Sequence, residues 1–390
     1  MFLSTNRKIK LIPCLFISVL LNDIPNAWPA PQGSPIADNN YKVDLSHGVV
    51  IGPARKVALG GAYTAISEGV ESLADNPAGV AFRPSYSDGY WDWDGSLGWY
   101  PIGNNDFENS GSDSIAYNSH QIVNIGLLGQ YGRWGLGLYG NTEQYDVIGA
   151  SNSNRFNLSD LFIAFGASFW DRQLTFGIGI RPVSLNITPL GNDSLKLLEL
   201  SSSGTTMGMV WHPDRGAFRI GLSFSSSMTS NQNLPQGGPT PIKVNGLIVP
   251  SEVTIPVEGA IGIAYKFNAL NPNPLLLAFD IRASGPIENA VGINSFLEQT
   301  VQTKGESVSV GYHTGIEGEI IPGRLILRFG DYLEPSRFSG VSARNHLTGG
   351  FEMRAFKINV FGERNLSISY AFDVAKQYFV NFISLGFWHF

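Results

Sequence analysis

From about residue 86 onward, apolar and polar residues alternate along the chain with a period of two. In the stretch IVNIGLLGQYGRWGLGLYGN, Val123, Ile125 and Leu127 fall on one face, and small or polar residues fall on the other. Gly132 and Arg133 separate the two runs, with Gly in the first position as a two-residue hairpin turn prefers. Period-two alternation is typical of strands that have one apolar face. The sequence therefore predicts an all-β chain built from successive hairpins.

Strands of a soluble β-sandwich also alternate apolar and polar residues, so the alternation alone does not identify a membrane barrel. The lengths of the strands and of their connections distinguish the two folds. Many apolar-polar runs here exceed ten residues, whereas soluble strands usually have about 5–6. Connections alternate between short turns and long polar loops, the layout of a transmembrane β-barrel, and our count of about 14 strands places both termini at the short-turn end. We expect short turns near 132, 171, 214, 270, 322 and 360, and long loops at 101–119, 142–157, 188–195, 227–250, 284–306 and 332–345.

A barrel in lipid directs the apolar face of each strand outward and the polar face into the lumen, and closure leaves no unpaired strand edge. The charges that alternate with apolar residues therefore point inward. They interleave in sign across neighbouring strands, which predicts ion pairs that keep the lumen wet; a relay for a substrate is the alternative. His313 falls on the same face as a polar lumen residue, and Pro256 within a strand predicts a bulge. The predicted lumen charges are Glu258, Asp280, Arg282, Glu317, Arg328, Glu352 and Arg354.

Composition agrees with a barrel that contacts membrane lipids. Charged residues make up 15% of the chain, compared with about 25% in soluble domains. The net charge of −6 and the lack of a basic stripe argue against a nucleic-acid partner. Tryptophans near predicted strand ends indicate aromatic girdles at the membrane interfaces. These are Trp91, Trp93, Trp99, Trp170, Trp211 and Trp388.

The first residues predict a secretory signal peptide. Arg7, Lys8 and Lys10 precede the apolar run at 11–21, which is too short to span a bilayer as a helix. We expect residues 1–27 to be removed; a buried N-terminal strand is the alternative. No later segment is long and apolar enough for a transmembrane helix, and the one cysteine of the chain, Cys14, falls within the predicted signal.

Motifs for catalysis or for cofactor and metal binding are absent from the sequence. It has no HExxH, no paired Cys, no GxSxG and no phosphate-binding loop. We therefore predict no catalytic residue, no metal site and no cofactor. Two acidic stretches have the ligand type that divalent cations prefer, but solvated loops are the favoured interpretation. They contain Asp92 and Asp94, and Asp106, Glu108 and Asp113.

One stretch before the strands has a different character. The sequence ARKVALGGAYTAISEGVESLADNPAGVAF predicts a small-residue helix from Ala58 to Ala65, followed by Asn76, Pro77 and Ala78. Pro77 lacks an N–H group and restricts Asn76 to extended backbone, and an Asn side chain can hold a turn. Two glycines allow close packing against a neighbouring wall. They are Gly60 and Gly61.

This stretch resembles the N-terminal hatch of the FadL-like family, outer-membrane transporters of long-chain fatty acids and other hydrophobic compounds. It is equally similar to the PorV-type barrels of that superfamily, which serve protein secretion. The segment HTGIEGEIIPGRLILRFGDYLEPS also resembles late strands of the family. The C-terminal Phe390 resembles the recognition signal for the barrel assembly machinery, although the aromatic alternation before it breaks at Ser384 and Gly386 and the last connection, at 375–377, is short.

The resemblance implies a barrel of 14 strands with the hatch folded into its lumen. It divides the chain into a signal peptide at 1–27, an N-terminal extension and hatch at 28–84, and a transmembrane β-barrel at 85–390. The implied function is an outer-membrane channel for passive, hatch-gated uptake of hydrophobic small molecules such as long-chain fatty acids. A PorV-like shuttle in protein secretion and a barrel hydrolase are the alternatives. The hatch either only blocks leakage or also forms part of the ligand path.

Overall fold

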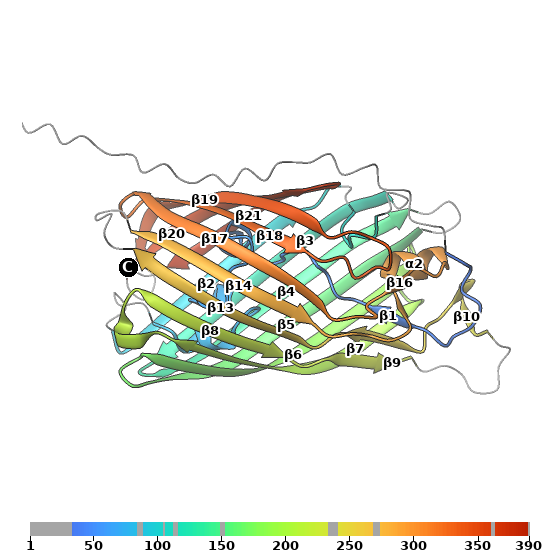
Figure 1. Cartoon of the computed structure of the whole chain (residues 1–390), viewed down its shortest axis with the longest axis horizontal. Coiled ribbons are helices and arrows are strands. Elements are labelled where there is room, and N and C mark those ends of the chain that lie inside the picture. Colours follow the sequence, from blue (N-terminus) through green and yellow to red (C-terminus); the bar gives the residue numbers. More distant parts are fainter. Residues whose placement is uncertain are drawn as a thin grey trace, which may run out of the picture.

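A closed antiparallel barrel dominates the computed structural model, which describes residues 33–83, 89–103, 106–111, 116–148, 153–232, 241–267, 274–359 and 363–388. Each strand pairs with its neighbour in sequence around a ring of fourteen strands, so the predicted fold class is confirmed (Figure 1). The strands are β2 (Trp91–Pro101), β3 (Ala116–Tyr131), β4 (Trp134–Ile148), β5 (Ser153–Phe169), β6 (Leu174–Pro189), β7 (Leu198–Trp211), β8 (Phe218–Ser225), β13 (Glu258–Phe267), β14 (Leu275–Ser284), β17 (Ser309–Ile321), β18 (Leu325–Glu334), β19 (Arg344–Asn359), β20 (Glu363–Ala375) and β21 (Tyr378–Trp388).

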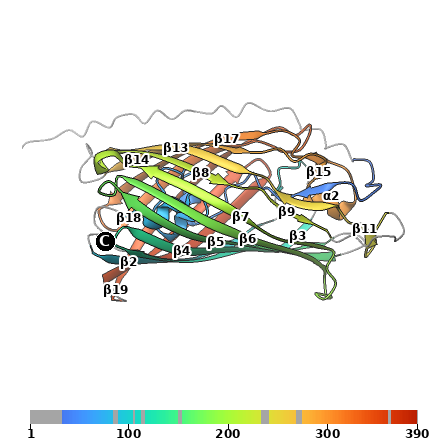
Figure 2. The same cartoon turned by 90° about the horizontal axis from the view of Figure 1, so that it is seen from below.

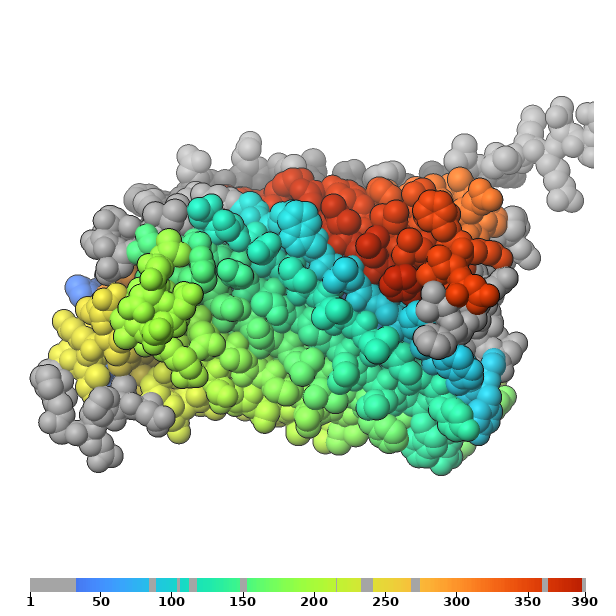
Figure 3. All heavy atoms as spheres, turned by 180° about the vertical axis from the view of Figure 1, so that it is seen from behind, coloured from blue at the N-terminus to red at the C-terminus, as the bar shows by residue number. Residues whose placement is uncertain are grey.

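Pairing of the first and last strands closes the ring. β2 pairs with β21 from Gly95 opposite Phe387 to Trp99 opposite Ile383. Closure satisfies the backbone groups that lipid cannot. The outward faces carry the predicted apolar residues, with Ile125 and Leu127 exposed by 65% and 59%. In Figure 3 the cyan to green residues of the early strands and the red residues of the last strands meet along one wall of the barrel.

The connections follow the predicted alternation, with one exception. One end of the barrel carries only short connections, and the other carries the larger connections together with the short ones after β4 and β20 (Figure 1). The turns predicted near 270 and 360 lie outside the described residues. The long loop predicted at 142–157 is wrong, because β4 continues to Ile148 and β5 begins at Ser153. Polar residues on both faces of these strand ends resemble a loop in sequence. Cross-strand pairs hold them in the ladder, including the ion pair of Arg155 with Asp146 at 2.9 Å.

The N-terminal residues lie at the long-loop end and complete a small sheet there, which we call the cap. β1 (Lys42–Asp44) runs parallel to β12 (Glu252–Ile255) and β15 (Ala290–Val291), with β9 (Met228–Asn231) and β16 (Thr303–Lys304) at the edges. The short helix α2 (Ile293–Glu298) and the hairpin of β10 (Lys243–Val244) and β11 (Leu247–Ile248) lie at the same end (Figure 2). Apolar side chains of β1, β12 and α2 share one buried cluster with residues of the barrel wall.

The cap bears on two predictions. Both ends of the barrel, where β2 begins and β21 ends, lie at the short-turn end as the even strand count predicts, whereas the described part of the N-terminal extension begins at the long-loop end, with Val43 and Leu45 buried between long connections. Pro256 does not form a bulge within a strand; it lies between β12 of the cap and β13 of the barrel.

From the cap the chain enters the lumen and forms the plug, residues 53–83. It contains α1 (Ala54–Ala58) and the 3-10 turns η1 (Val70–Ser72) and η2 (Pro77–Ala81). α1 packs against β18 to β21, η1 against β2 to β4, and η2 against β3 to β7. The residues between them contact β8, β13, β14 and β17, so the plug meets every strand of the barrel. No helix in the described ranges is both long and apolar enough to cross a bilayer.

The helix predicted from Ala58 to Ala65 is wrong, because the two glycines end a helix instead of lying within one. Gly60 and Gly61 have φ of 60° and 79°. Their N–H groups donate to the carbonyls of Val57 and Lys56, both at 2.9 Å, in the pattern of a glycine C-cap. The chain can therefore turn across the lumen directly after α1.

Candidate functional site

Asn76 ties the reversal of the plug to itself and to the wall. Its backbone is extended and Pro77 follows at the first position of η2. The side-chain Oδ1 accepts from the N–H of Ala78 at 3.1 Å, and Nδ2 donates to the carbonyl oxygens of Thr64 at 2.9 Å and Met209 at 3.2 Å. The side chain is fully buried. One amide thus joins η2, an earlier turn of the plug and strand β7.

Glycines on the lumen face let the wall approach the plug backbone. A Cβ on Gly208 would collide with the Asn76 side chain, and one on Gly177 would collide with the backbone of Pro77. From the plug side, a Cβ on Gly60 would lie only 2.8 Å from backbone carbonyl oxygens of β17 and β18. Real Cβ contacts do not come so close, so a side chain at these positions forces the plug and wall apart.

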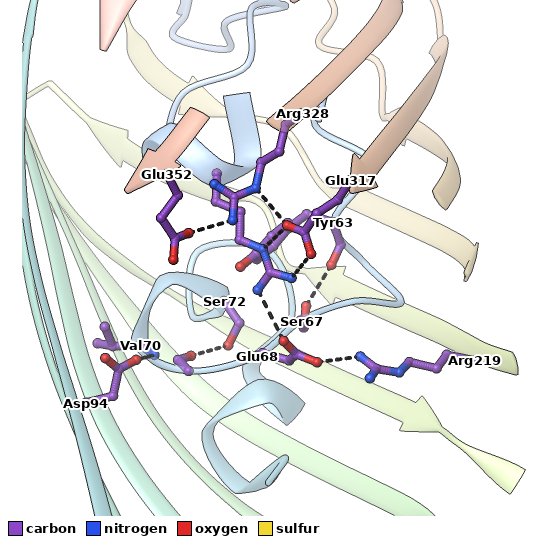
Figure 4. Close-up of polar contacts among 12 residues, drawn as sticks. Tyr63, Ser67, Glu68, Val70, Ser72, Asp94, Arg219, Glu317, Arg328 and Glu352 are labelled. Carbon is purple, nitrogen blue, oxygen red and sulfur yellow. Dashed lines mark hydrogen bonds and ion pairs between the residues drawn. The ribbon is translucent and has the colours of Figure 1, made fainter. Parts of the chain in front are cut away.

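Ion pairs anchor α1 to the part of the wall formed by β17 to β19 (Figure 4). The Arg55 guanidinium donates to both carboxylate oxygens of Glu317, at 2.9 and 3.0 Å. Glu317 also accepts from Arg328 at 2.7 Å, and Arg328 donates to Glu352 at 2.5 Å. Buried charges are tolerated only when they are paired in this way.

The same guanidinium leads to a second anchor on β8. Arg55 donates to Glu68 at 3.1 Å, and Glu68 accepts from Arg219 at 2.7 Å. Burial alone would raise the pKa of Glu68. The positive charges of Arg219 and Arg55 outweigh this effect and hold the pKa of Glu68 below its ordinary value. Glu68 is therefore ionised and links the plug to the wall.

A third anchor joins the plug to β14. The Asp75 carboxylate lies 2.9 Å from Lys56 Nζ within the plug and 2.7 Å from Arg282 Nη2 on the wall. Burial alone would raise the pKa of Asp75, but these two cations hold it below its ordinary value. The neighbouring Asp280 accepts from the backbone N–H groups of Tyr63 and Thr64 at 2.9 and 2.8 Å.

The plug separates two cavities in the lumen. The outer cavity, of about 260 Å³, lies toward the cap and is lined by apolar residues such as Val50 and Leu73 together with Lys56, Asp75 and Arg282. The inner cavity, of about 390 Å³, lies toward the short turns, and its lining includes the Arg55 and Glu68 anchors. The plug is the partition between them.

Glu71 lines the inner cavity in a strongly acidic setting. Burial, followed by the negative charges of Asp94 on β2 and Glu352 on β19, raises the pKa of Glu71 from 4.5 to about 8. The cations Arg55 and Arg328 only partly offset them. Glu71 therefore titrates near neutral pH at the boundary between plug and cavity.

The predicted lumen charges all lie inside the barrel. Six of the seven line a cavity, and Asp280 binds the plug. Glu258 lies 3.9 Å from Arg181, and Arg354 lies 3.4 Å from Glu319. His313 is buried on the same face, and its Nδ1 donates to the carbonyl of Gly60 at 2.7 Å. The predicted motif residues from Asn76 to Ala78 lie in the plug, with Gly60 and Gly61.

The described acidic side chains of the two acidic stretches contact donors of the protein itself. Asp94 lies in β2 and accepts from the N–H of Val70 at 2.7 Å, and Asp92 on the same strand pairs with Arg364 at 3.0 Å. Glu108 pairs with Lys304 at 2.9 Å, whereas Asp113 lies outside the described residues. Within the described ranges, no group of three His, Cys, Asp or Glu residues is placed to hold a metal ion.

Sequence reasoning missed the charges of the plug itself. The stretch was interpreted through its small residues and its Asn-Pro-Ala motif alone, and its charged residues are Arg55, Lys56, Glu68, Glu71 and Asp75. The signal was present, because charges of both signs in an otherwise apolar segment indicate buried ion pairs with the lumen face.

Comparison with known proteins supports the fold. The sequence matches no family model and no curated protein. Solved structures of similar fold include the CymD monoaromatic hydrocarbon channel (13% identity, 87% of this chain and 97% of that chain covered, TM-score 0.55) and the Ralstonia pickettii toluene transporter TbuX (14%, 87% and 98%, 0.54). A Pseudomonas aeruginosa FadL homologue is similar at 12% identity, with 87% and 99% covered and a TM-score of 0.55. The predicted resemblance to FadL-like barrels is confirmed at the level of the fold.

Proposed function

We propose that this protein is an outer-membrane channel for passive uptake of hydrophobic small molecules, with the plug as its hatch. The observation that carries the proposal is the partition of one lumen into two cavities by a segment that contacts every strand. The fold is shared with a monoaromatic hydrocarbon channel and a toluene transporter. A partition held by ion pairs and hydrogen bonds can move without unfolding the barrel.

The outer cavity supplies the entry site in this proposal. Apolar side chains line part of the outer cavity. They come from the segment between β1 and α1 and from β3, and include Val49, Val50, Ile51 and Ile122. Its volume of about 260 Å³ falls below the range of roughly 300–1,000 Å³ that holds drug-sized ligands. A small hydrophobic molecule fits whole, and a long-chain fatty acid enters end-on.

The flanking segments complete the proposal. Residues 1–27 act as a cleaved signal, 28–84 as extension and hatch, and 85–390 as the barrel in the bacterial outer membrane, delivered there by the barrel assembly machinery through Phe390. The signal residues and Phe390 lie outside the described residues. The apolar outward faces of the strands contact the membrane lipids.

Two observations favour transport over the alternatives. Apolar residues of the described long connections, such as Leu247, Val253 and Phe296, are packed into the cap, whereas a secretion shuttle needs apolar loops on display. Both ring nitrogens of His346 contact carboxylates, Nε2 that of Glu334 and Nδ1 that of Asp373, so neither is left to take a proton from a serine.

Flux measurements test the proposal. The full-length protein is reconstituted in liposomes, and entry of radiolabelled toluene and of decanoate is compared with that in protein-free liposomes. We expect the protein to accelerate entry of at least one hydrophobic tracer but not of glucose. Equal rates with and without protein for both tracers would contradict the proposal.

A further inference from the structure

One arginine lies on the outward side of the barrel, away from the charges of the lumen. Arg133 belongs to the short turn between β3 and β4 and is exposed. Its guanidinium carbon lies 4.6 Å from the ring centroid of Trp134 and 5.4 Å from that of Phe169. Arg181 in the lumen differs, because Asp160 pairs with it at 2.5 Å. Among the described residues no carboxylate pairs with Arg133, so the N–H donors of its guanidinium are open to a molecule from outside.

The rings beside this guanidinium belong to a group on the outward faces of β4 to β6. We call it the aromatic cluster, and its members are Trp134, Phe165, Phe169 and Phe176. Trp134 stacks on Phe165 with ring centroids 5.3 Å apart, and Phe169 meets Phe176 edge-on at 6.1 Å. All four rings are exposed, and farther from the turns the same faces carry aliphatic side chains such as Leu136. Aromatic belts mark the level of the lipid head groups, so the guanidinium lies at that level.

The turn that carries Arg133 is held by neighbouring segments on both sides. The N–H of Gly132 donates to the carbonyl of Tyr90 at 2.7 Å, and the N–H of Ser168 donates to the carbonyl of Arg133 at 2.9 Å. Gly132 has φ of 59°, a value that glycine adopts readily in a two-residue hairpin turn. Because the backbone and the flanking rings already position the guanidinium, an anion that binds it loses little affinity to ordering it.

We propose that Arg133 and the aromatic cluster form a binding site for the phosphate of a glycerophospholipid in the periplasmic leaflet of the outer membrane. Short turns of outer-membrane barrels face the periplasm. The periplasmic leaflet consists of glycerophospholipids, whereas lipopolysaccharide occupies the outer leaflet. The inference therefore rests on the proposed location in the outer membrane and goes beyond the channel function, on which it does not depend.

The chemistry of the site selects the head group. A guanidinium can bind two phosphate oxygens through parallel N–H groups, and it can do so while it is stacked on aromatic rings. A quaternary ammonium such as choline binds ring faces, but here the guanidinium already covers them and repels a second cation. An anionic lipid such as phosphatidylglycerol is therefore preferred over phosphatidylcholine. Its acyl chains lie against the aliphatic outward residues of β4 and β6, which include Leu136, Leu138 and Ile178.

Native mass spectrometry of the full-length protein in detergent micelles tests the site. Titration with dioleoyl phosphatidylglycerol gives the dissociation constant of the first bound lipid, and dioleoylglycerol is the probe with the same chains and no phosphate. Arg133→Gln should weaken phosphatidylglycerol binding by about tenfold, the scale of a lost charge-assisted hydrogen bond, and should change dioleoylglycerol binding by less than about twofold. Arg133→Lys keeps the charge without the parallel N–H groups, so its affinity should lie between those of the natural protein and Arg133→Gln.

Arg324→Gln is the matched control. It removes the same charge from another exposed short turn, between β17 and β18, at a position that has no ring contact with the described residues. Phosphatidylglycerol affinity should stay within about twofold of the natural protein, well below the change for a lost charge-assisted hydrogen bond. Equal weakening in Arg133→Gln and Arg324→Gln would mean that net charge alone attracts the lipid, and unchanged affinity in Arg133→Gln would mean that its guanidinium does not bind phosphate. Either result overturns the site.

Lipid that remains bound during purification identifies the leaflet. When the natural protein and Arg133→Gln are extracted mildly from outer membranes, the adduct that the variant loses should have the mass of a glycerophospholipid. Loss of a lipid A adduct instead, or of no adduct, overturns the proposal.

Tracer entry separates this site from the channel function. Toluene and decanoate should enter liposomes at the same rate with Arg133→Gln as with the natural protein. A lipid site that fails these tests leaves the channel function standing, and a protein that admits no tracer can still bind phosphatidylglycerol through Arg133.

Discussion

The carboxylate of Asp75 lies 2.7 Å from Nη2 of Arg282, and this contact joins the middle of the plug to strand β14 of the wall. Residues more than 200 positions apart in the chain therefore meet at the partition between the two cavities. Similar contacts join Arg55 to Glu317 and Glu68 to Arg219. Charges hold the plug to β8, β14 and β17, and close packing against lumen-face glycines holds it along β4 to β8 and β17 to β19. These two kinds of contact lead to the following predictions.

Adding one methyl group to the lumen wall should displace the plug. Gly208→Ala places a Cβ where the Asn76 side chain lies, and neither β7 nor the buried amide has space to yield. We expect larger and more frequent conductance steps in planar bilayers than for the natural protein. Gly129→Ala is the control, because its Cβ would meet nothing within 4 Å. Identical traces for the two variants would mean that the glycine contact does not seal the lumen.

The closed state should weaken as pH rises. Glu71 has a pKa raised from 4.5 to about 8 when it is packed beside Asp94 and Glu352, whereas an opened plug exposes it to water and returns the pKa toward 4.5. A raised pKa favours the closed state at low pH, and this stabilisation is lost as pH rises from about 4.5 to about 8 and changes little above that.

Conductance between pH 5 and pH 9 measures this effect. The open fraction should rise through the window and then level off in the natural protein. In Glu71→Gln, which cannot ionise, this part of the pH dependence should disappear. A rise of equal size in the variant would assign the pH dependence to another group.

The two faces of β13 should respond differently to charge. Ile261 faces outward, with 49% of its surface exposed, and Ala260 lines the outer cavity. Ile261→Arg should lower the free energy of unfolding in lipid by about 2–4 kcal/mol if the residue lies near the midplane. Ala260→Arg should cost less, since its side chain remains in the lumen. Urea unfolding in liposomes, followed by gel migration, compares them; equal costs would contradict the assignment of faces.

The sequence predicts those features of the fold that depend on residues close together in the chain, and it does not predict contacts between residues far apart in the chain. Period-two alternation at Val123, Ile125 and Leu127 correctly predicts which face points out of the barrel, because a strand places alternate side chains on opposite faces. The position of β1 could not be predicted, since Lys42 pairs with Glu252 and no local pattern encodes a partner so distant. Local chemistry was also misread where Gly60 ends α1, because glycine both packs closely and terminates helices.

The site shows the same division. Asn76 was expected to hold a turn, and it does so through the N–H of Ala78. Its bond to Met209 depends on the closed barrel and has no trace in the local sequence. Charges such as Asp75 indicate buried ion pairs already in the sequence, but the wall residue that each one contacts is set only by the closed barrel.

The cap predicts that the N-terminal segment is accessible from the long-loop side. Asp38 is exposed there, whereas Arg133 is exposed at a short turn. Asp38→Cys should react with a membrane-impermeant maleimide on intact cells, and Arg133→Cys should react only after lysis. Labelling in the reverse order would invert the topology.

The central claim is that residues 53–83 close the lumen, and the double variant Asn76→Ala, Pro77→Gly tests it most directly. The change removes the bonds from Asn76 to Thr64, Ala78 and Met209 and frees the backbone that Pro77 restricts, while every ladder of the barrel stays intact. Heat-modifiable gel migration confirms that the barrel has folded. Planar-bilayer recordings of the folded variant should then show long-lived openings of higher conductance than the natural protein. A folded variant with the same low conductance as the natural protein would contradict the claim.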